Sequence, residues 1–429
     1  MLSRLILAHH MLYLVVVTEA SICPTKSQML YRYTLTAAQK LGLFFANLEQ
    51  VSNVLSTAAE EHMRWKSWSR VESLKNLILG LILHDSSLSG IFSTSPVISA
   101  DTLHLALPCD FDFYRARSER EWTQLNSQGL SNTAPTMKLS HNEYFLPDLP
   151  SRVHISCLYG PMCAIIIRLT TSYHRLILNS DLAREEQHQY IPWRIYSLDR
   201  RANMTTHVVV RFIQLYDTII RNTNPNCVVI WHNLCLHLTT DIRLLERAAG
   251  REGPEAMQTA RQAISVWAKT PAARRACLHA AQIFRTFSNW KPTDGTGFQP
   301  VRSLFQSALV LALYILVSPR LESAQDSEGF DLARIDIDWK AVGEEGLADG
   351  PQDQNEQSRT ENPAVNFIRF GGPISLCGKA YFMGARHARR LVLDFASLLD
   401  EVGKHWMAKY PRLLYMIHDT ILDVNVDAT

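Results

Sequence analysis

The chain has 429 residues, of which 47% are hydrophobic and 20% charged, a globular composition with room for one large domain or two to three average ones. It carries 43 lysines and arginines against 41 aspartates and glutamates, and this near balance excludes the electrostatic footprint of a dedicated nucleic-acid binder. The eight cysteines are scattered without paired spacing, which indicates reduced, buried thiols in an intracellular protein.

The N-terminal segment permits two interpretations. Arg4, the apolar run Met11–Val17 and the small residues after it follow each other in the order that a signal peptide also has. The run is too short to span a bilayer, however, and two histidines, His9 and His10, stand directly before it. We therefore expect a core helix here. We expect no segment of transmembrane length elsewhere, and hence a soluble protein without a membrane partner.

A long helix is predicted first, because apolar residues recur between Trp68 and Leu88 with a period near 3.6 and leave one wide apolar face. The segment Asp85–Gly90 is predicted to end this helix, since short polar side chains and glycine favour a turn.

Helical patterns continue along the chain. Pro254 and Pro271 stand where a first helical turn accepts proline, and Thr270 is predicted to cap the helix that follows it. No convincing alternating strand pattern appears, so the predicted fold class is all-α, a large helical array. The helices expected in this part of the chain span residues 203–222, 228–249, from 254 onward, 272–290 and 298–317.

One acidic stretch, Glu322–Asn362, interrupts the helical pattern. Its glycines, Pro351 and a run of polar residues deny it a core, so Gly343–Pro363 is predicted to be a disordered loop before the last helices. An amphipathic helix is then expected from about Gly384 to Trp406. The predicted organisation is a helical domain over residues 1–321, an acidic flexible loop over 322–365, and C-terminal helices over 366–429 that pack on the same domain.

The nearest arrangement to a zinc site consists of Cys227, His232, Cys235 and His237. A zinc cluster needs closely spaced pairs of cysteines, and a zinc finger needs two cysteines and two histidines at fixed short spacing. Here Cys227 is expected to lie before the helix that carries the other three residues. We therefore predict no metal site and no cofactor.

Catalytic signatures are not found in the sequence. It contains no nucleophile elbow, no glycine-rich phosphate loop and no His-Glu-x-x-His motif. A helical enzyme of the terpene-cyclase kind would need an aspartate-rich motif on one helix face, but Asp85 has no second acid nearby and Asp336 and Asp338 lie in the expected loop. We predict no enzyme and no catalytic residues, and we keep an all-α enzyme or a small-molecule-binding helical protein as the alternative.

Two carboxylates and two basic runs are the remaining charged features of interest. Glu72 and Asp85 stand at the edges of an apolar helix, and a buried carboxylate needs partners, for which Arg70, His84 or backbone donors are available. The basic pairs and triplets are predicted to be solvated helix faces rather than phosphate contacts. They consist of Arg274 and Arg275, and of Arg386, Arg389 and Arg390.

Several segments resemble one known family. The tryptophan-rich segment Trp65–Ser73 (WKSWSRVES) and the later Leu105–Asp110 (LALPCD) are similar to the core of the fungal-specific transcription-factor regulatory domain, the middle homology domain of zinc-cluster and C2H2 transcription factors. The resemblance runs from about Leu30 over nearly the whole chain. Its further segments are Leu103–Trp122, Ile230–Gly253, Trp267–Arg285, Asp331–Gly346 and Phe367–His405.

The resemblance implies a nuclear regulator of transcription, and its motifs are neither catalytic nor ligand-binding signatures. Members carry a zinc module before this domain, and that module, with its zinc, is not in this sequence. The chain is thus expected to be either a free-standing regulatory domain or the product of a truncated gene model. We expect it to act through protein partners, as a homodimer or a heterodimer with a DNA-binding regulator, and with a small-molecule effector. Control of a secondary-metabolite gene cluster is a further expectation from the resemblance alone.

Overall fold

The computed structural model describes most of the chain. The described residues are 24–40, 44, 61–99, 103–109, 113, 115–127, 136–139, 144–146, 149, 155–178, 191–295, 297–319, 329–334, 336–347, 362–402 and 409–423. Helices dominate among them, which confirms the predicted all-α class. The expected N-terminal core helix over Met11–Val17 and most of the expected disordered loop lie outside the described residues.

The chain divides into two compact units, which are described separately. Unit 1 comprises residues 1–174 and 218–223, and unit 2 comprises residues 175–217 and 224–429. The long helix α9 (Arg200–Thr223) belongs to unit 2 except for its last six residues.

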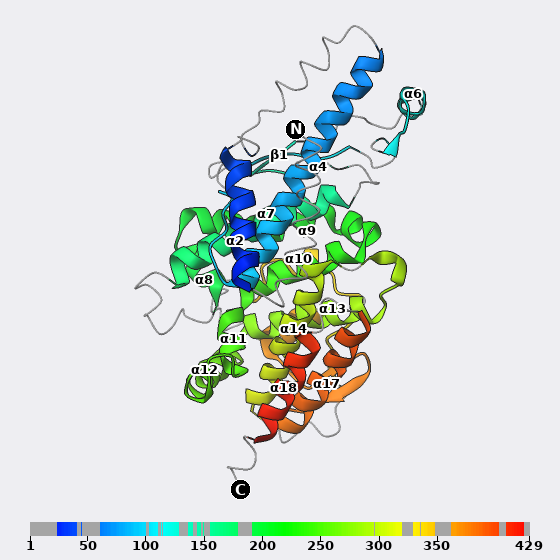
Figure 1. Cartoon of the computed structure of the whole chain (residues 1–429). Helices are drawn as coiled ribbons and strands as arrows, with labels where there is room; N and C mark the ends of the chain where they lie inside the picture. Colours follow the sequence, from blue (N-terminus) through cyan, green and yellow to red (C-terminus); the bar gives the residue numbers. More distant parts are fainter. Residues whose placement is uncertain are drawn as a thin grey trace. The chain divides into compact units, whose positions relative to one another are not determined.

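Unit 1 is built on two packed helices, α4 (Glu61–Phe92) and α7 (Ser156–Tyr173). Gly160 lies at their crossing, where an added Cβ would come within 2.4 Å of a Leu79 methyl carbon, so a larger residue there would require the Leu79 side chain to move. The smaller helices α2 (Pro24–Lys40) and α6 (Glu119–Ser127) pack against α4 (Figure 1).

The predicted end of the first helix at Asp85–Gly90 is wrong, because α4 continues to Phe92. The hydroxyl groups of Ser86 and Ser89 donate to the helix carbonyls of Leu83 and Ser86, so these short side chains bond back to the helix instead of opening a turn. The segment stays helical because its polar groups are satisfied inside the buried interface.

Two small sheets were not predicted from the sequence. In unit 1, β1 (His104–Ala106), β2 (Thr136–Leu139) and β3 (Tyr144–Phe145) form an antiparallel sheet. In unit 2, β4 (Phe330–Asp331) pairs in parallel with β5 (Ile374–Leu376), which pairs antiparallel with β6 (Lys379–Tyr381). Strands of two to four residues are too short to give a readable alternation.

Unit 2 is organised around α14 (Phe298–Val317), which packs against α10 (Pro225–Thr239), α13 (Pro271–Ser288) and α17 (Ala385–Val402) (Figure 1). Both bounds of α14 match the prediction. Its segment Gln299–Val317 has the length and apolar composition needed to cross a bilayer, contrary to our expectation, but 83% of it is buried inside the protein, as in the core helix of a soluble protein.

The other helices of unit 2 complete this array. They are α8 (Pro192–Ser197), α11 (Ile242–Ala248), α12 (Pro254–Trp267), α15 (Trp339–Val342), α16 (Pro363–Phe370) and α18 (Lys409–Asp423). Of these, α11 and α12 pack on α14, α16 packs on α13, and α18 packs on α17.

Helix ends in unit 2 follow local capping chemistry. Thr270 caps α13 as predicted, since its hydroxyl accepts the N–H of Ala273 at 3.1 Å. The predicted single helix over residues 228–249 is wrong, because Thr240 is extended and the Asp241 carboxylate caps a new helix, α11. An aspartate at that position satisfies two backbone N–H groups, which makes a second helix start more favourable than continuation.

Candidate functional site

A buried histidine pair lies in unit 2, where α10 faces α13. The Nδ1 atoms of His232 and His279 are 2.9 Å apart, and both rings are buried. Trp339, the first residue of α15, stacks on His279 with ring centroids 4.1 Å apart and an interplanar angle of 17°. Trp231 closes another side with its ring edge toward Trp339 at 5.4 Å. Two tryptophans, Trp231 on α10 and Trp339 on α15, thus pack around the contact between the two histidine rings.

Arg275 fixes the protonation state of this pair. Its Nε–H donates to His279 Nε2 at 3.3 Å, and an arginine only donates, so His279 Nε2 accepts and its proton is on Nδ1. That proton is then donated to His232 Nδ1, and both rings are neutral. Burial first, then the charge of Arg275 and the interaction with the neighbouring His232 ring, hold the pKa of His279 well below its usual value.

The basic pair on α13 is not a solvated face, contrary to our prediction. Arg275 is 2% exposed, and its Nη1 donates to the carbonyl oxygens of Gly343 at 2.9 Å and Glu345 at 2.7 Å. Arg274 donates from Nε and Nη2 to the carbonyl oxygens of Ile368 and Arg369, at the end of α16. Both guanidinium groups therefore bind backbone carbonyls that no helix or strand satisfies.

A second buried polar group consists of three amides between α10 and α14. Gln299 donates to Asn233 at 3.4 Å, and Asn233 donates to Gln306 at 2.7 Å. Within the described part of the chain, Gln299 Oε1 and Gln306 Nε2 have no hydrogen-bond partner. The chain of amides thus ends in one open acceptor and one open donor, and it joins the two helices through a directional contact in an apolar core.

The four residues nearest to a zinc pattern do not converge. Cys227 lies in the first turn of α10 rather than before the helix, so this detail of our prediction is wrong. His232 turns to His279, and Cys235 is buried beside Arg275. Burial and the charge of Arg302 lower the pKa of His237 to about 3. Over the described residues, no three His, Cys, Asp or Glu side chains are grouped so that they could hold a metal ion.

In unit 1 the two predicted carboxylates are buried and bind backbone N–H groups. Asp85 accepts from the N–H groups of Val97 at 3.1 Å and Ile98 at 2.7 Å, and from the hydroxyl of Tyr31 at 2.5 Å. Burial raises the pKa of Asp85, against the opposing effect of these donors. The partners of Asp85 are thus two backbone donors, which were among those expected, and a tyrosine hydroxyl, which was not.

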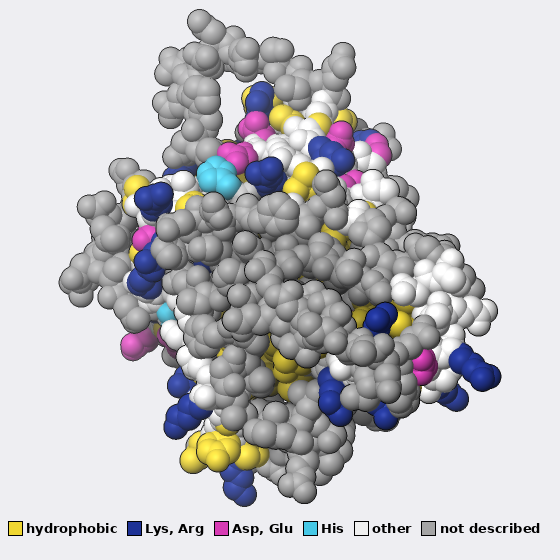
Figure 2. Space-filling view, turned by 90° about the horizontal axis from the view of Figure 1, so that it is seen from above, with side chains coloured by type: hydrophobic (Ala, Val, Ile, Leu, Met, Phe, Trp, Pro, Cys, Tyr) yellow, Lys and Arg dark blue, Asp and Glu magenta, His cyan; other side chains and the backbone are white. Residues whose placement is uncertain are grey.

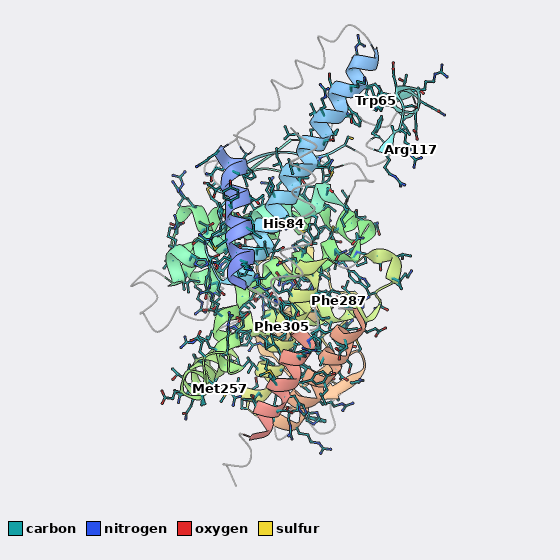
Figure 3. The ribbon with its side chains drawn as sticks, viewed as in Figure 1. Trp65, His84, Arg117, Met257, Phe287 and Phe305 are labelled. Atoms are coloured by element: carbon teal, nitrogen blue, oxygen red, sulfur yellow. The ribbon has the colours of Figure 1, made fainter. Side chains whose placement is uncertain are left out.

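Glu72 is the second of these buried carboxylates. It pairs with Lys75 at 2.6 Å and accepts the N–H of Cys109 at 3.0 Å, which joins the tryptophan-rich segment to the LALPCD segment. Trp68, one turn earlier, packs against Phe113 and Trp122 in a buried cluster. Trp65 packs on the edge of that cluster and points toward α6 in Figure 3.

The acids considered for metal-diphosphate chemistry have structural partners. Asp338 caps α15 by accepting the N–H groups of Lys340 and Ala341 at 3.0 and 3.1 Å. Asp336 is exposed and binds the guanidinium of Arg334, which lowers the pKa of that carboxyl to about 2. This arrangement gives a helix start and a surface ion pair.

The last basic group, Arg386, Arg389 and Arg390, lies on α17. Arg386 and Arg390 are exposed, and the guanidinium of Arg390 lies over the ring of Tyr381, 5.8 Å from its centre. The exposure of Arg386 and Arg390 agrees with the predicted solvated face, and Arg389 is partly exposed. On the face drawn in Figure 2, lysine and arginine side chains are distributed among acidic and neutral ones.

No protein-family model matches this chain, no curated protein matches its sequence, and no solved structure matches it.

The sequence indicated some of these groups and missed others. Glu72 and Asp85 were singled out because acids in an apolar helix need partners. His279 was missed, since it is 47 residues from His232 and a lone histidine in an alanine-rich helix gives no signal. The role of Arg275 was missed as well, although its neighbours Ala272, Ala273 and Ala276 leave an apolar face around it that marks it as buried.

Proposed function

We propose that the chain is a transcription-regulatory domain of fungal type that acts in the nucleus without catalysis. It exerts its effect through protein partners, as a homodimer or as a heterodimer with a DNA-binding regulator, and responds to a small effector. The resemblance of the sequence motifs is the basis of this proposal. Target genes in a secondary-metabolite cluster follow from the same resemblance.

One structural observation carries the proposal furthest. The residues of two resembling segments, 37 positions apart, meet in a fixed interior contact, since the N–H of Cys109 donates to the buried carboxylate of Glu72. Trp68 and Trp122 from the same segments pack together with ring centroids 5.6 Å apart. The motif residues thus form the scaffold of a unit, which is the use expected of a regulatory domain whose motifs carry no chemistry.

Unit 2 supports the same interpretation. Asp331, from the resembling segment Asp331–Gly346, accepts the N–H groups of Cys377 and Gly378 at 3.1 and 3.3 Å. These two residues form the turn between β5 and β6, where both have positive φ angles of 50° and 77°. A carboxylate that holds a strained turn is committed to structure, as is the helix cap Asp338.

A reporter experiment tests the regulatory role. The full chain is fused to an unrelated DNA-binding module and expressed in a fungal host with a reporter gene under the matching operator. We expect reporter output to change several-fold, in either direction, relative to the module alone and to the module fused to an unrelated helical protein. Unchanged output from a fusion that is folded and nuclear would contradict the proposal.

A mobility-shift experiment tests the need for a partner. Specific binding requires side chains placed in a groove and several phosphate contacts, whereas this chain has a net charge of only +2. We expect the purified chain to bind duplex DNA weakly and without sequence preference at physiological salt. Salt-resistant, sequence-selective binding by the isolated chain would contradict the proposed dependence on a DNA-binding partner.

A further inference from the structure

The segment Trp339–Leu347, which we call the clasp, is held on α13 by contacts far apart in sequence. Arg275 binds the carbonyl oxygens of Gly343 and Glu345, and Trp339 stacks on His279. Gly346 has a φ of +78°, and a Cβ there would lie 3.1 Å from the carbonyl oxygen of Pro271, the first residue of α13. The clasp therefore rests on α13 through its backbone and one aromatic ring.

The histidine pair beneath the clasp has no position for an additional proton. If His279 takes up a proton, it does so on Nε2, and the hydrogen bond from Arg275 is lost. If His232 takes one up on Nδ1, two N–H groups face each other across 2.9 Å. In the first case a buried imidazolium is created beside the guanidinium of Arg275. Protonation is therefore compatible only with a rearranged or open cluster.

We propose that the clasp is an acid-released element, docked on α13 while His232 and His279 are neutral and released when either imidazole takes up a proton. Release frees both carbonyl oxygens from Arg275 and exposes the ring of Trp339. This inference rests on the geometry of unit 2 and is independent of the proposed role in transcription.

The charged groups around the pair determine the sign of the response. On α13 the nearest charge is Arg275, and on α10 the titratable neighbour is Cys235, whose thiol stays protonated because burial raises its pKa to about 12. The clasp contributes Glu344 and Glu345, which act on Arg275. From α14, Tyr314 interacts with Arg274 and Cys277 at the other side of α13. No acid among these described groups is close enough to His279 to offset Arg275.

A further histidine lies at the exposed edge of the clasp. The Nδ1 atom of His207 on α9 lies 2.8 Å from the carboxylate of Glu344. This contact is about half exposed and is worth at most about 1 kcal/mol. The buried contact differs, because a protonated His279 lies directly beside the guanidinium of Arg275. Variants at the two histidines identify which contact controls the clasp.

Hydrogen exchange on the whole protein between pH 7.5 and 5.5 provides the test. Rates for peptides covering residues 339–347 are corrected for intrinsic exchange and compared with peptides from α14, which report on opening of the core of the same unit. The pKa of His279 is depressed in the closed state, whereas an imidazole in the open state has a pKa of about 6.5, so the closing free energy has its full value above about pH 6.5 and decreases progressively below it. We expect corrected opening of the clasp to rise about tenfold for each histidine that takes up a proton.

Matched variants separate the buried pair from the exposed one. In H279Q the amide can accept from Arg275 and donate to His232 without titrating, so the acid-dependent opening should fall or disappear. H207Q should leave it in place. The proposal is overturned if the unaltered protein shows no rise in clasp opening, if opening falls in acid, or if H207Q rather than H279Q removes the response. The measurement on the unaltered protein decides the matter even if H279Q does not fold.

Discussion

Unit 1 and unit 2 both use charged side chains to bind backbone groups of distant segments, but the charges have opposite signs. In unit 1, the buried carboxylates of Glu72 and Asp85 on α4 bind backbone N–H groups of distant segments. In unit 2, Arg274 and Arg275 on α13 bind backbone carbonyl oxygens of distant segments. Each unit therefore uses one long helix to fix irregular chain by charged hydrogen bonds.

The difference follows from the backbone group that is left without a partner. The segments at Val97–Ile98 and Cys109 present donors toward α4, whereas the C-terminal end of α16 and the clasp present acceptors toward α13. A charge-assisted hydrogen bond is stronger than a neutral one, and it is worth most where water is excluded. A buried charge in this protein is thus an indicator of an unsatisfied backbone group nearby.

The largest effect is expected for Asp85→Ala. The change leaves two N–H groups and the Tyr31 hydroxyl buried without an acceptor, which should reduce the free energy of unfolding of unit 1 by about 4 kcal/mol. Asp85→Asn keeps one acceptor oxygen and should lose about half as much. Denaturant unfolding followed by tryptophan fluorescence measures both. Equal losses for the two variants would show that the negative charge of Asp85, which both remove, is important rather than the number of acceptor oxygens.

The corresponding change in unit 2 is Arg275→Met. Removal of the guanidinium leaves the carbonyl oxygens of Gly343 and Glu345 without their donor and should cost about 3 kcal/mol. Arg274→Met is the matched control on the same helix. Because Arg274 is half-buried and water can replace it, we expect a loss of about 1.5 kcal/mol. A larger loss for Arg274→Met than for Arg275→Met would contradict the inference that the more deeply buried arginine contributes more to the stability of unit 2.

Two glycines of the clasp provide a test at intermediate magnitude. Gly346→Ala forces a Cβ to 2.7 Å from a methyl carbon of Ile368 in a left-handed backbone conformation, and it should cost about 2 kcal/mol. Gly343→Ala shares the positive φ but meets only one atom, at 3.8 Å, so the expected cost is about 1 kcal/mol. Thermal unfolding measures the pair. A reversed order would mean that the clasp does not rest on α13 as described.

The smallest effect is expected at Glu72. Glu72→Gln keeps an acceptor for the N–H of Cys109 and loses only the ion pair with Lys75, at a cost of about 1 kcal/mol. Lys75→Met removes the cation and leaves the carboxylate buried, so it should cost more than Glu72→Gln. Chemical denaturation of both variants gives the order. A smaller loss for Lys75→Met would show that the N–H of Cys109 alone is sufficient for the carboxylate.

The helices of the fold were predictable because their signals are local. The apolar period of α14, the cap at Thr270 and the first-turn proline Pro254 depend on neighbouring residues only, and these elements begin where the sequence predicts. The errors arise where a tertiary contact decides. The run at Asp85–Gly90 resembles a turn, yet it stays helical because Val97, Ile98 and Tyr31 satisfy its carboxylate.

The polar cluster of unit 2 was beyond prediction from the sequence for a similar reason. Its members His232, His279 and Trp339 are separated by 47 residues or more, and each has an ordinary interpretation as a core or surface residue on its own helix. Only the packing of α10, α13 and α15 brings them together. Arg275 was interpreted as solvated because arginines on helices usually are, and its carbonyl partners lie 68 and 70 residues further along the chain.

The distance along the chain between the α13 arginines and their partners has a consequence for biosynthesis. Arg274 and Arg275 are made 68 to 95 residues before the carbonyl groups that they bind. While the ribosome makes α14, the core helices can pack, but both guanidinium groups still face water. Docking of the clasp and of α16 then has to follow as a late step, because contacts so distant along the chain form slowly. A nascent chain halted after α14 would carry these two charges without the four carbonyl groups that they bind in the complete fold.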